Sequence, residues 1–138
     1  MDTLIYQTKF WKIDLSDNQY YLGRCYVSLK RQCPALSQLT KEEMLDFFEI
    51  AKKLEPALKK AFGSTMFNWT CLMNNAYKSE NPKPQVHFHF KPRYNHKVNF
   101  EGEVFEDKEF AHHYDHKAKK EVSEEIMRKI IEKIKANM

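Results

Sequence analysis

One segment near the middle of the chain carries the sequence signals for both ends of a helix. Thr40 and Glu43 have the spacing of a capping box, and Gly63 is the residue type that ends helices in a left-handed conformation. Pro56 lies between these ends and is expected to kink or loosen the helix. Apolar residues recur at helical steps at Met44, Phe47, Phe48, Ala51, Leu54, Leu58, Ala61 and Phe62. The spacing predicts an amphipathic helix over 40–63 whose apolar stripe faces the core.

Alternating apolar and polar residues predict four strands around this helix. The strands cover residues 11–15, 24–30, 67–74 and 85–91, and a polar turn at 16–19 joins the first two into an antiparallel hairpin. Residues 75–84 and 95–116 are predicted to be mostly loop, and residues 117–137 an amphipathic helix that packs on the domain or on a second subunit. Because the connections are too short for several parallel crossovers, this order predicts an α+β fold with an antiparallel sheet.

Length and composition limit the class of protein. The 138 residues are enough for one domain, and the apolar share of 42% is enough for a core. No apolar run approaches the roughly 18–20 residues of a membrane helix, and the residues at the start of the chain lead us to expect no secretory signal. Three cysteines without CxxC spacing indicate reduced thiols, so we expect a cytoplasmic protein. The net charge of +4 is concentrated in residues 117–138 and mixed with acids there, so we expect no nucleic-acid or membrane partner.

Residues 85–93 carry the clearest chemistry. Side chains of a strand alternate between its two faces, so the apolar residues at 86, 88 and 90 are expected to point into the core. Neighbouring groups on the other face would lie about 6.6–6.8 Å apart. That face would carry Gln85, His87, His89 and Lys91, followed by Arg93. Such a surface suits a polyanion and offers two groups that can act as nucleophile or proton donor near pH 7.

Three interpretations of this face are open from spacing alone. One is phosphate chemistry in which a histidine attacks phosphorus; another is a metal site built on His-x-His; the third is a hydrogen-bonded sheet face without chemistry. Gln85 is a poor metal ligand, and Lys91 and Arg93 would repel a cation, which favours phosphate. A nucleophilic imidazole needs an acceptor at its other nitrogen, expected here to be a backbone carbonyl. Charge on the phosphoryl oxygens would be met by His89, Gln85 or backbone amides, with no metal required.

A second cluster of histidines lies in the segment predicted to be a loop. It comprises His112, His113 and His116, together with Asp115. On a helix, residues 112 and 116 would share a face and could bind a metal. The alternative is a solvated loop or an interface near the active site. His96 is predicted to lie at the surface.

The segment from Gln85 to Arg93 resembles a known signature. It is similar to the His-x-His-x-His-x-x-Pro-Arg motif of the histidine triad (HIT) family, with Gln85 in the first histidine position. Upstream segments resemble further family features in the correct order: Leu22–Gln32, Ser37–Thr40 followed by Glu42 and Glu43, and Met73–Asn75. The similarity covers roughly residues 5–94 and is greatest to the diadenosine-tetraphosphate-hydrolase-like branch. This sequence departs from the pattern at Gln85, Arg24, Gln32, Pro82 and Lys83.

The resemblance implies a fold, an assembly and a set of site residues. The fold would be one antiparallel sheet with a central and a C-terminal helix, usually in a homodimer. The family acts on nucleotides through a covalent nucleotidyl-histidine, which places the nucleophile at His87 and a phosphate contact at His89. Asn74 occupies the position of a nucleotide contact, and the residue that holds the ribose hydroxyls falls near Ser16.

These observations lead to one expected function and two alternatives. We expect a nucleotide hydrolase, or a nucleotidyl transferase, that cleaves a phosphoanhydride or phosphoramidate at the α-phosphate of a nucleotide such as a dinucleoside polyphosphate, without a cofactor. Residues 1–116 would form the HIT-like nucleotide-binding domain, with helix 117–138 part of the same domain. His87 would be catalytic, and the substrate would be bound by Gln85, His89, Asn74, Ser16 and Arg93. The alternatives are a non-catalytic, regulatory HIT module and a metalloprotein that uses the His-x-His strand.

Overall fold

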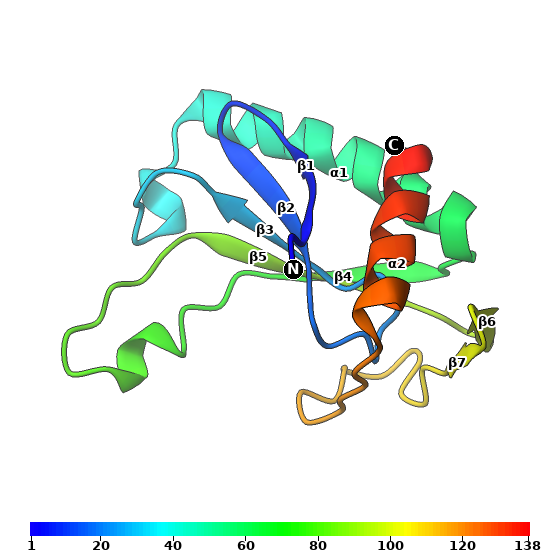
Figure 1. Ribbon diagram of the computed structural model, residues 1–138. Helices are drawn as coiled ribbons and strands as arrows, with labels where there is room; N and C mark the ends of the chain where they lie inside the picture. Colours follow the sequence, from blue (N-terminus) through cyan, green and yellow to red (C-terminus); the bar gives the residue numbers. More distant parts are fainter.

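The computed structural model describes residues 1–138 and contains one five-stranded sheet, one separate hairpin and two α-helices (Figure 1). The sheet has the strand order β1-β2-β3-β5-β4, and every neighbouring pair is antiparallel. This confirms the predicted α+β class. The elements are β1 (Leu4–Gln7), β2 (Trp11–Leu15), β3 (Cys25–Leu29), η1 (Leu36–Gln38), α1 (Lys41–Phe62), β4 (Met66–Thr70), η2 (Ala76–Lys78), β5 (His87–Arg93), β6 (Val98–Phe100), β7 (Glu103–Phe105) and α2 (Glu124–Ala136).

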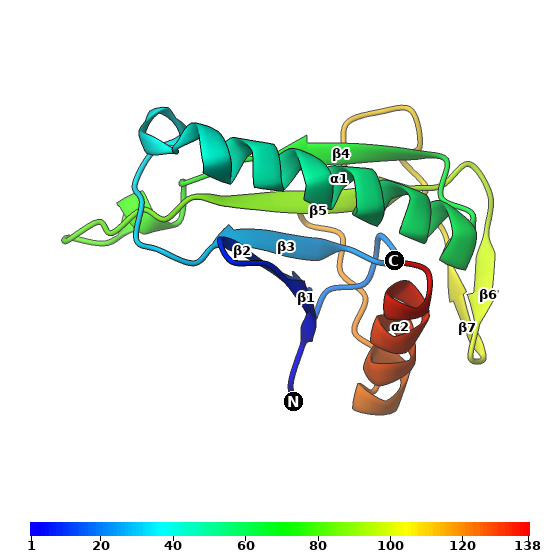
Figure 2. The same cartoon turned by 90° about the horizontal axis from the view of Figure 1, so that it is seen from above.

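The two helices enclose the core on one face of the sheet. Helix α1 lies across β4 and β5, whereas α2 packs beside α1 and against β1 (Figure 2). The core joins the inward residues of the central strands to both helices, and Trp11, Val27, Phe90 and Ile130 are all fully buried. The opposite face of the sheet, which carries the histidines, is therefore left for a site. No helix combines the length and the apolar character needed to cross a membrane.

Helix α1 begins and ends where its sequence signals predict. Thr40 accepts a hydrogen bond from the Glu43 amide, the Glu43 carboxylate accepts one from the Thr40 amide, and Gly63 ends the helix with a φ of 73°. The helix is continuous through Pro56, whose ring is exposed. Its buried face was predicted wrongly in the first turns, because Met44 and Phe48 are 44% and 58% exposed. The buried positions instead start at Glu43, which is fixed beneath the helix by Arg31.

Two strands have different bounds from those predicted. Strand β4 ends at Thr70, so residues 71–74 are not part of it. Strand β5 starts at His87 and continues through Pro92 to Arg93. Proline is tolerated there because pairing with β3 ends at Phe90, so that beyond this point β5 pairs only with β4.

The prediction of mostly loop over residues 95–116 missed the β6–β7 hairpin. Its turn residues Glu101 and Gly102 have φ values of 52° and 79°, and positive φ at both positions is the geometry of a type I′ turn.

Strand β1 was not predicted. The C-terminal helix starts at Glu124 rather than at 117, because Ser123 is its N-cap. Its apolar stripe packs on the domain itself, with Ile130 and Ile134 fully buried.

In the predicted polar turn at 16–19, Ser16 and Gln19 are buried, whereas Asp17 is exposed. The Gln19 side chain donates to the Ser16 carbonyl at 2.7 Å and to the Arg24 carbonyl at 3.1 Å, and it accepts from the Gly23 amide at 2.8 Å. These bonds give the backbone polar groups of a buried connection their partners. Residues 118–120 cover the turn, where the Gln19 amide donates to the Lys120 carbonyl at 2.9 Å.

Candidate functional site

Strand register places a row of polar side chains on the face that the helices leave open. Tyr26 of β3, His89 of β5 and Thr70 of β4 lie directly opposite one another, and Ser28 lies opposite His87. The alternation predicted for β5 is confirmed, because Phe90 points into the core and is fully buried. Both histidines of the strand therefore face away from the core, with ring centroids 5.0 Å apart.

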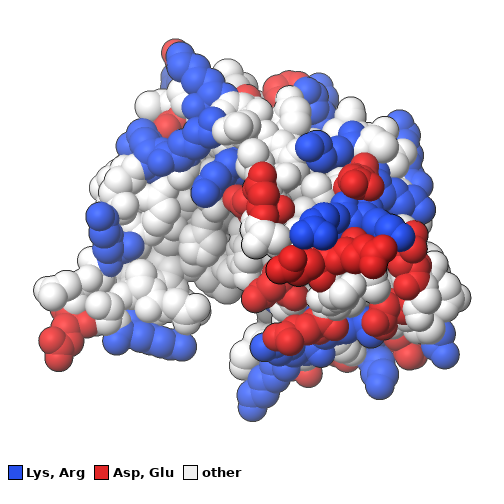
Figure 3. Space-filling view, in the orientation of Figure 1, with Lys and Arg blue, Asp and Glu red and all other residues white.

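A cavity of about 710 Å³ lies over these histidines. Its floor includes Gln85, His87 and His89, and one wall is the arm, which we define as residues 71–86 between β4 and β5. The arm projects from the body of the molecule, and the space-filling view shows a hollow between the two (Figure 3). The other wall is part of the C-terminal loop, defined as residues 106–120, which contributes His113, Tyr114 and His116. No aspartate or glutamate lines the cavity, so its electrostatic field suits an anion.

His87 is held with one ring nitrogen free. Its Nδ1 lies 2.8 Å from the backbone carbonyl oxygen of Gln85. Because a carbonyl can only accept, this contact favours the tautomer with the proton on Nδ1 and leaves the lone pair of Nε2 available. The backbone carbonyl expected from the sequence is thus present. His87 is half-buried and lines the cavity, as an attacking group must.

His89 is neutral at physiological pH. Its burial, together with the nearby charge of Lys91, lowers its pKa to about 4. Three buried polar atoms on this face have no hydrogen-bond partner: His89 Nδ1, Thr70 Oγ1 and Arg24 Nε. Buried polar atoms are normally paired, so this row has free capacity to bind a ligand.

The Gln85 side chain has a structural role. Its amide nitrogen donates to the Leu29 carbonyl at 2.8 Å and the Arg31 carbonyl at 2.7 Å, and its oxygen accepts from the Cys33 amide at 2.8 Å. Gln85 therefore fastens the root of the arm to the end of β3. An imidazole has only two ring nitrogens and could satisfy at most two of these three backbone groups.

Arg93 does not reach the cavity, contrary to the expectation that it binds substrate. Its side chain is 1% exposed and pairs with Asp107, with Nε 2.7 Å from Oδ2. Its remaining donors contact Asn68 and the carbonyl oxygens of Glu109 and His112 at 2.7–2.9 Å. With every donor engaged inside the protein, Arg93 holds the C-terminal loop in place and has none left for a phosphate.

Lys91 lies beneath the C-terminal loop. Its ammonium is 3.9 Å from the centroid of the Tyr114 ring, a cation–π contact. Burial, with smaller contributions from Arg24 and Arg93, lowers its pKa to about 8. Lys91 does not line the cavity, so its charge acts from below Tyr114 rather than through direct contact with a ligand.

Two other predicted binding residues have contrasting positions. Asn74 is exposed on the arm and lines the cavity. Ser16 is 1% exposed, accepts a hydrogen bond from the Asn18 amide at 3.1 Å and does not line the cavity. Ser16 is thus separated from the two histidines by β3 and is covered by the C-terminal loop, so the structure does not bring it to the site.

Nine cavity residues were not among the predicted site residues, and four of these nine are lysines or histidines. Lys78 and Lys83 come from the arm, and His113 and His116 come from the C-terminal loop. The histidine cluster was visible in the sequence, but only the fold shows that two of its members line the same cavity as His87 and His89 of β5. No group of three or more His, Cys, Asp or Glu side chains has an arrangement that could hold a metal ion, so the proposed alternative metal site has no support in this geometry.

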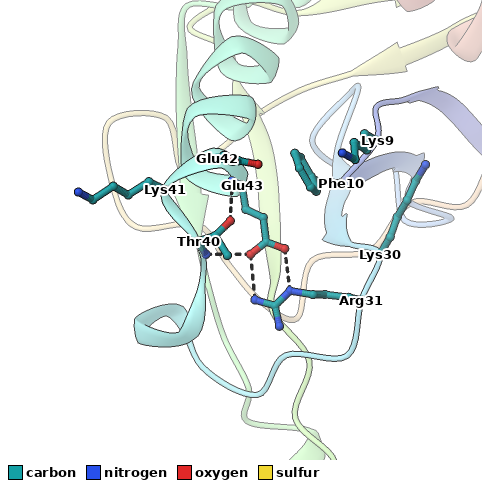
Figure 4. A pocket seen from close by; sticks show the side chains of 8 residues that line it. All are labelled: Lys9, Phe10, Lys30, Arg31, Thr40, Lys41, Glu42 and Glu43. Carbon is teal, nitrogen blue, oxygen red and sulfur yellow. Dashed lines mark hydrogen bonds and ion pairs between the residues drawn. The ribbon is translucent and has the colours of Figure 1, made fainter.

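A second hollow, of about 640 Å³, lies at the start of α1 (Figure 4). Arg31 and Glu43 pair inside it, with Arg31 Nε 2.7 Å from Glu43 Oε2. This pair and the Thr40 amide lower the pKa of Glu43 to about 2. The remaining lining residues include Lys9, Lys30 and Phe10 but no histidine, cysteine or free buried carboxylate. This hollow therefore lacks a group that could act as a nucleophile near neutral pH.

Comparisons with known proteins agree with this arrangement. The sequence model of the HIT domain matches residues 2–96, which is more than half of the chain. A search of curated proteins found no match.

Solved structures share the fold at low sequence identity. A hypothetical histidine triad nucleotide-binding protein from Sulfolobus tokodaii has a TM-score of 0.72 and 12% identity, over 99% of this chain and 83% of its own. A histidine triad protein from Sinorhizobium meliloti has a TM-score of 0.73 and 18% identity, over 99% and 90%. The NitFhit protein of C. elegans has a TM-score of 0.66 and 21% identity, over 99% of this chain and 27% of its own. At these identities the similarity establishes the fold alone.

Proposed function

Since this chain belongs to the HIT domain family, we propose that it is a nucleotide hydrolase or nucleotidyl transferase that works through a covalent intermediate on His87. The observation that carries the proposal is the contact between His87 Nδ1 and the Gln85 carbonyl oxygen at 2.8 Å. This contact orients the ring and leaves Nε2 without a partner in the protein, in a cavity of about 710 Å³ that no carboxylate lines. The substrate class is a nucleotide with a phosphoanhydride or phosphoramidate bond at its α-phosphate, such as a dinucleoside polyphosphate.

In the first step, the lone pair of His87 Nε2 attacks the α-phosphorus. A nitrogen–phosphorus bond forms while the bond from phosphorus to the leaving group breaks, and the leaving group takes the electron pair and a proton from water where it needs one. The imidazole then carries a positive charge, which the Gln85 carbonyl stabilises through the Nδ1 proton. Covalent catalysis divides one difficult displacement into two easier ones.

In the second step, water attacks the same phosphorus atom. The new oxygen–phosphorus bond replaces the nitrogen–phosphorus bond, the bonding electrons return to Nε2, and the proton lost by water passes to solvent. His89, neutral because burial lowers its pKa to about 4, serves as a hydrogen-bonding group toward the phosphoryl oxygens rather than as a cation. Asn74 is proposed to contact the nucleotide from the arm.

The direct test is His87→Ala. We expect turnover of a dinucleoside polyphosphate to fall by at least about a thousandfold, which corresponds to roughly 4 kcal/mol of activation free energy. The matched control is His96→Ala, because His96 is exposed and does not line the cavity. Wild-type protein quenched during turnover should carry a labelled nucleotide that the variant lacks. Normal turnover by a folded His87→Ala protein would contradict the proposal, and a wild type that binds nucleotide without turnover would favour a regulatory HIT module.

We also propose that the protein forms a homodimer. Strand β4 is an edge of the sheet with one unpaired side, and Met66 on it is 37% exposed. The exposed Met44 and Phe48 share one stripe of α1 with Glu55, which accepts a hydrogen bond from Trp69 of β4 at 2.8 Å. The apolar stripe and the open edge thus lie on the same side and suit a self-complementary interface. Light scattering should give a dimer mass for the wild type and a monomer mass for Phe48→Glu.

The domain assignment and location complete the proposal. We propose that α2 belongs to the same domain as residues 1–116, because Ile130 and Ile134 are fully buried in the common core. We keep the cytoplasm as the proposed location, on the basis of cysteine usage in the sequence.

A further inference from the structure

The His113–His116 segment presents an unusual combination of fixed backbone and exposed side chains. Arg93 holds the His112 carbonyl at 2.9 Å, and the Asp115 amide donates to the Tyr21 hydroxyl at 2.9 Å. Yet His113 and His116 are exposed, and both line the cavity that contains His87. Fixing a loop costs conformational entropy, and the core gains little from these two rings. Their placement is instead what a binding role requires.

We propose that His113 and His116, together with Lys78 and Lys83 of the arm, bind the phosphates of the leaving group. The inference rests on the proposed function, since it specifies the part of the same cavity that selects substrates with a polyphosphate leaving group. It assigns a specificity role to a segment that lies beyond residues 2–96, which the family model covers.

The direction of the reaction supports this assignment. In a phosphoryl displacement, the attacking and leaving atoms lie roughly in line with phosphorus. His87 attacks from the floor formed by β5, so the leaving group departs away from that strand, toward the mouth of the cavity between its two walls. Those walls are the arm and the C-terminal loop, from which the two lysines and the two histidines come.

His89, Lys91 and Arg93 of β5 supply no free positive charge to these phosphates. His89 is neutral because burial lowers its pKa, Lys91 is covered by Tyr114, and all donors of Arg93 are engaged within the protein. Lys78 and Lys83, in contrast, are exposed and form no ion pair. They are the two cationic side chains among the residues that line the cavity.

The imidazoles supply complementary donors. His116 makes no hydrogen bond within the protein, so the nitrogen that carries its proton is free to donate. His113 Nδ1 lies 2.8 Å from the Tyr114 carbonyl oxygen, and the ring centroids of His113 and Tyr114 lie 4.3 Å apart. In its imidazolium form, His113 would satisfy that carbonyl through Nδ1 and a phosphate oxygen through Nε2.

The experiment compares two substrates that transfer the same nucleotide. Diadenosine tetraphosphate releases a polyphosphate nucleotide, whereas adenosine 5′-phosphoramidate releases ammonia. For the double variant His113→Ala/His116→Ala, we expect the ratio of kcat/KM values, tetraphosphate over phosphoramidate, to fall about tenfold or more, as expected for lost hydrogen bonds to charged groups. Lys83→Met should shift the ratio in the same direction. His96→Ala is the control and should leave the ratio unchanged.

Equilibrium binding gives a second readout that does not require turnover. Calorimetry with ATP and with AMP should show that the double variant loses about tenfold more affinity for ATP than for AMP. Equal losses for both nucleotides, or no loss for either, would overturn the inference even if the wild type is an active hydrolase. A wild type that turns over neither substrate but shows the ATP-selective loss would refute the proposed function and leave the phosphate subsite standing.

Discussion

The two walls of the cavity are both irregular, but they are attached to the protein in opposite ways. In the arm, residues 72–83 form hydrogen bonds only among themselves, such as Ala76 amide to Met73 carbonyl at 3.2 Å. The C-terminal loop is bonded along its length to side chains of the body, including Arg93, Tyr21 and Asn18. A lack of regular secondary structure therefore does not mean a lack of order. Side-chain hydrogen bonds can fix one loop, whereas the absence of such bonds leaves another free to open locally.

The largest effect is expected from removing the buried ion pair that attaches the C-terminal loop, which tests directly whether the loop is held more firmly than the arm. Arg93→Met should lower the free energy of unfolding by about 3–5 kcal/mol, because it leaves the Asp107 carboxylate buried without its partner. Lys83→Met, on the arm, should change it by less than about 0.5 kcal/mol. Urea denaturation of both variants measures the difference, and similar values for the two would show that the walls are equally attached.

The lowered pKa of His89, on the floor of the cavity, predicts that the stability of the fold depends on pH. The folded-state pKa of His89 is lowered to about 4, below its unfolded value of about 6.5. The unfolded chain therefore binds more protons in this window, so stability falls as pH decreases from about 6.5 toward 4, by up to about 3 kcal/mol. His89→Gln should reduce this fall.

His96 has the opposite effect on stability. The carbonyl oxygens of Gly63 and Lys97 raise the pKa of His96, so its contribution to the free energy of unfolding is lost as pH rises.

Tyr21→Phe tests a single fastening of the C-terminal loop. The Tyr21 hydroxyl donates to Glu109 Oε1 at 2.7 Å and accepts from the Asp115 amide at 2.9 Å. Its loss should cost about 1–2 kcal/mol in urea denaturation, less than the loss of Arg93. If the His113–His116 segment depends on this anchor, then its amides should also exchange with solvent faster in the variant. Unchanged exchange would show that the remaining anchors, Arg93 and Asn18, are sufficient.

The smallest expected effect is a difference in the order in which trypsin cuts the arm and the C-terminal loop of the native protein. Trypsin should cut first after Lys78, because the neighbouring backbone has no bond to the body and Lys83 is protected by the following Pro84. Lys117 and Lys119 are also exposed, but they lie in the C-terminal loop and should be cut later. Mass spectrometry of the first fragments distinguishes the two orders. First cleavage within residues 106–120 would show that the C-terminal loop opens more readily than the arm.

Local signals were sufficient for much of the fold. The capping box at Thr40 and the stop at Gly63 depend on residues close in sequence, and both ends of α1 were predicted correctly. The alternation of apolar and polar residues around His87 correctly predicted which face of β5 points into the core. Pro92 was read as a strand end because sequence does not show that one side of β5 is already unpaired there.

The site was less predictable, because its composition depends on contacts between distant segments. Arg93 has the residue type of a phosphate ligand, and only the fold shows that Asp107, Asn68 and two backbone carbonyl groups accept all its hydrogen bonds. Ser16 lies near an expected binding position, but Ala118 and Lys120 bring the C-terminal loop over it, a contact between residues about a hundred positions apart. His116 could be placed in the same cavity as His87 only once that loop had been located.

The amide of Gln85 has a mechanical consequence for the site. It anchors the root of the arm to the backbone at Leu29, Arg31 and Cys33, whereas the tip near Lys78 is unattached. The arm is thus anchored at its root and free at its tip, and the anchoring residue lies only two positions from His87, the proposed nucleophile. A displacement of the tip would change the width of the cavity mouth without moving the carbonyl that holds His87. Under the proposed function, the cavity would then accept substrates of different length while Nε2 of His87 stays in place.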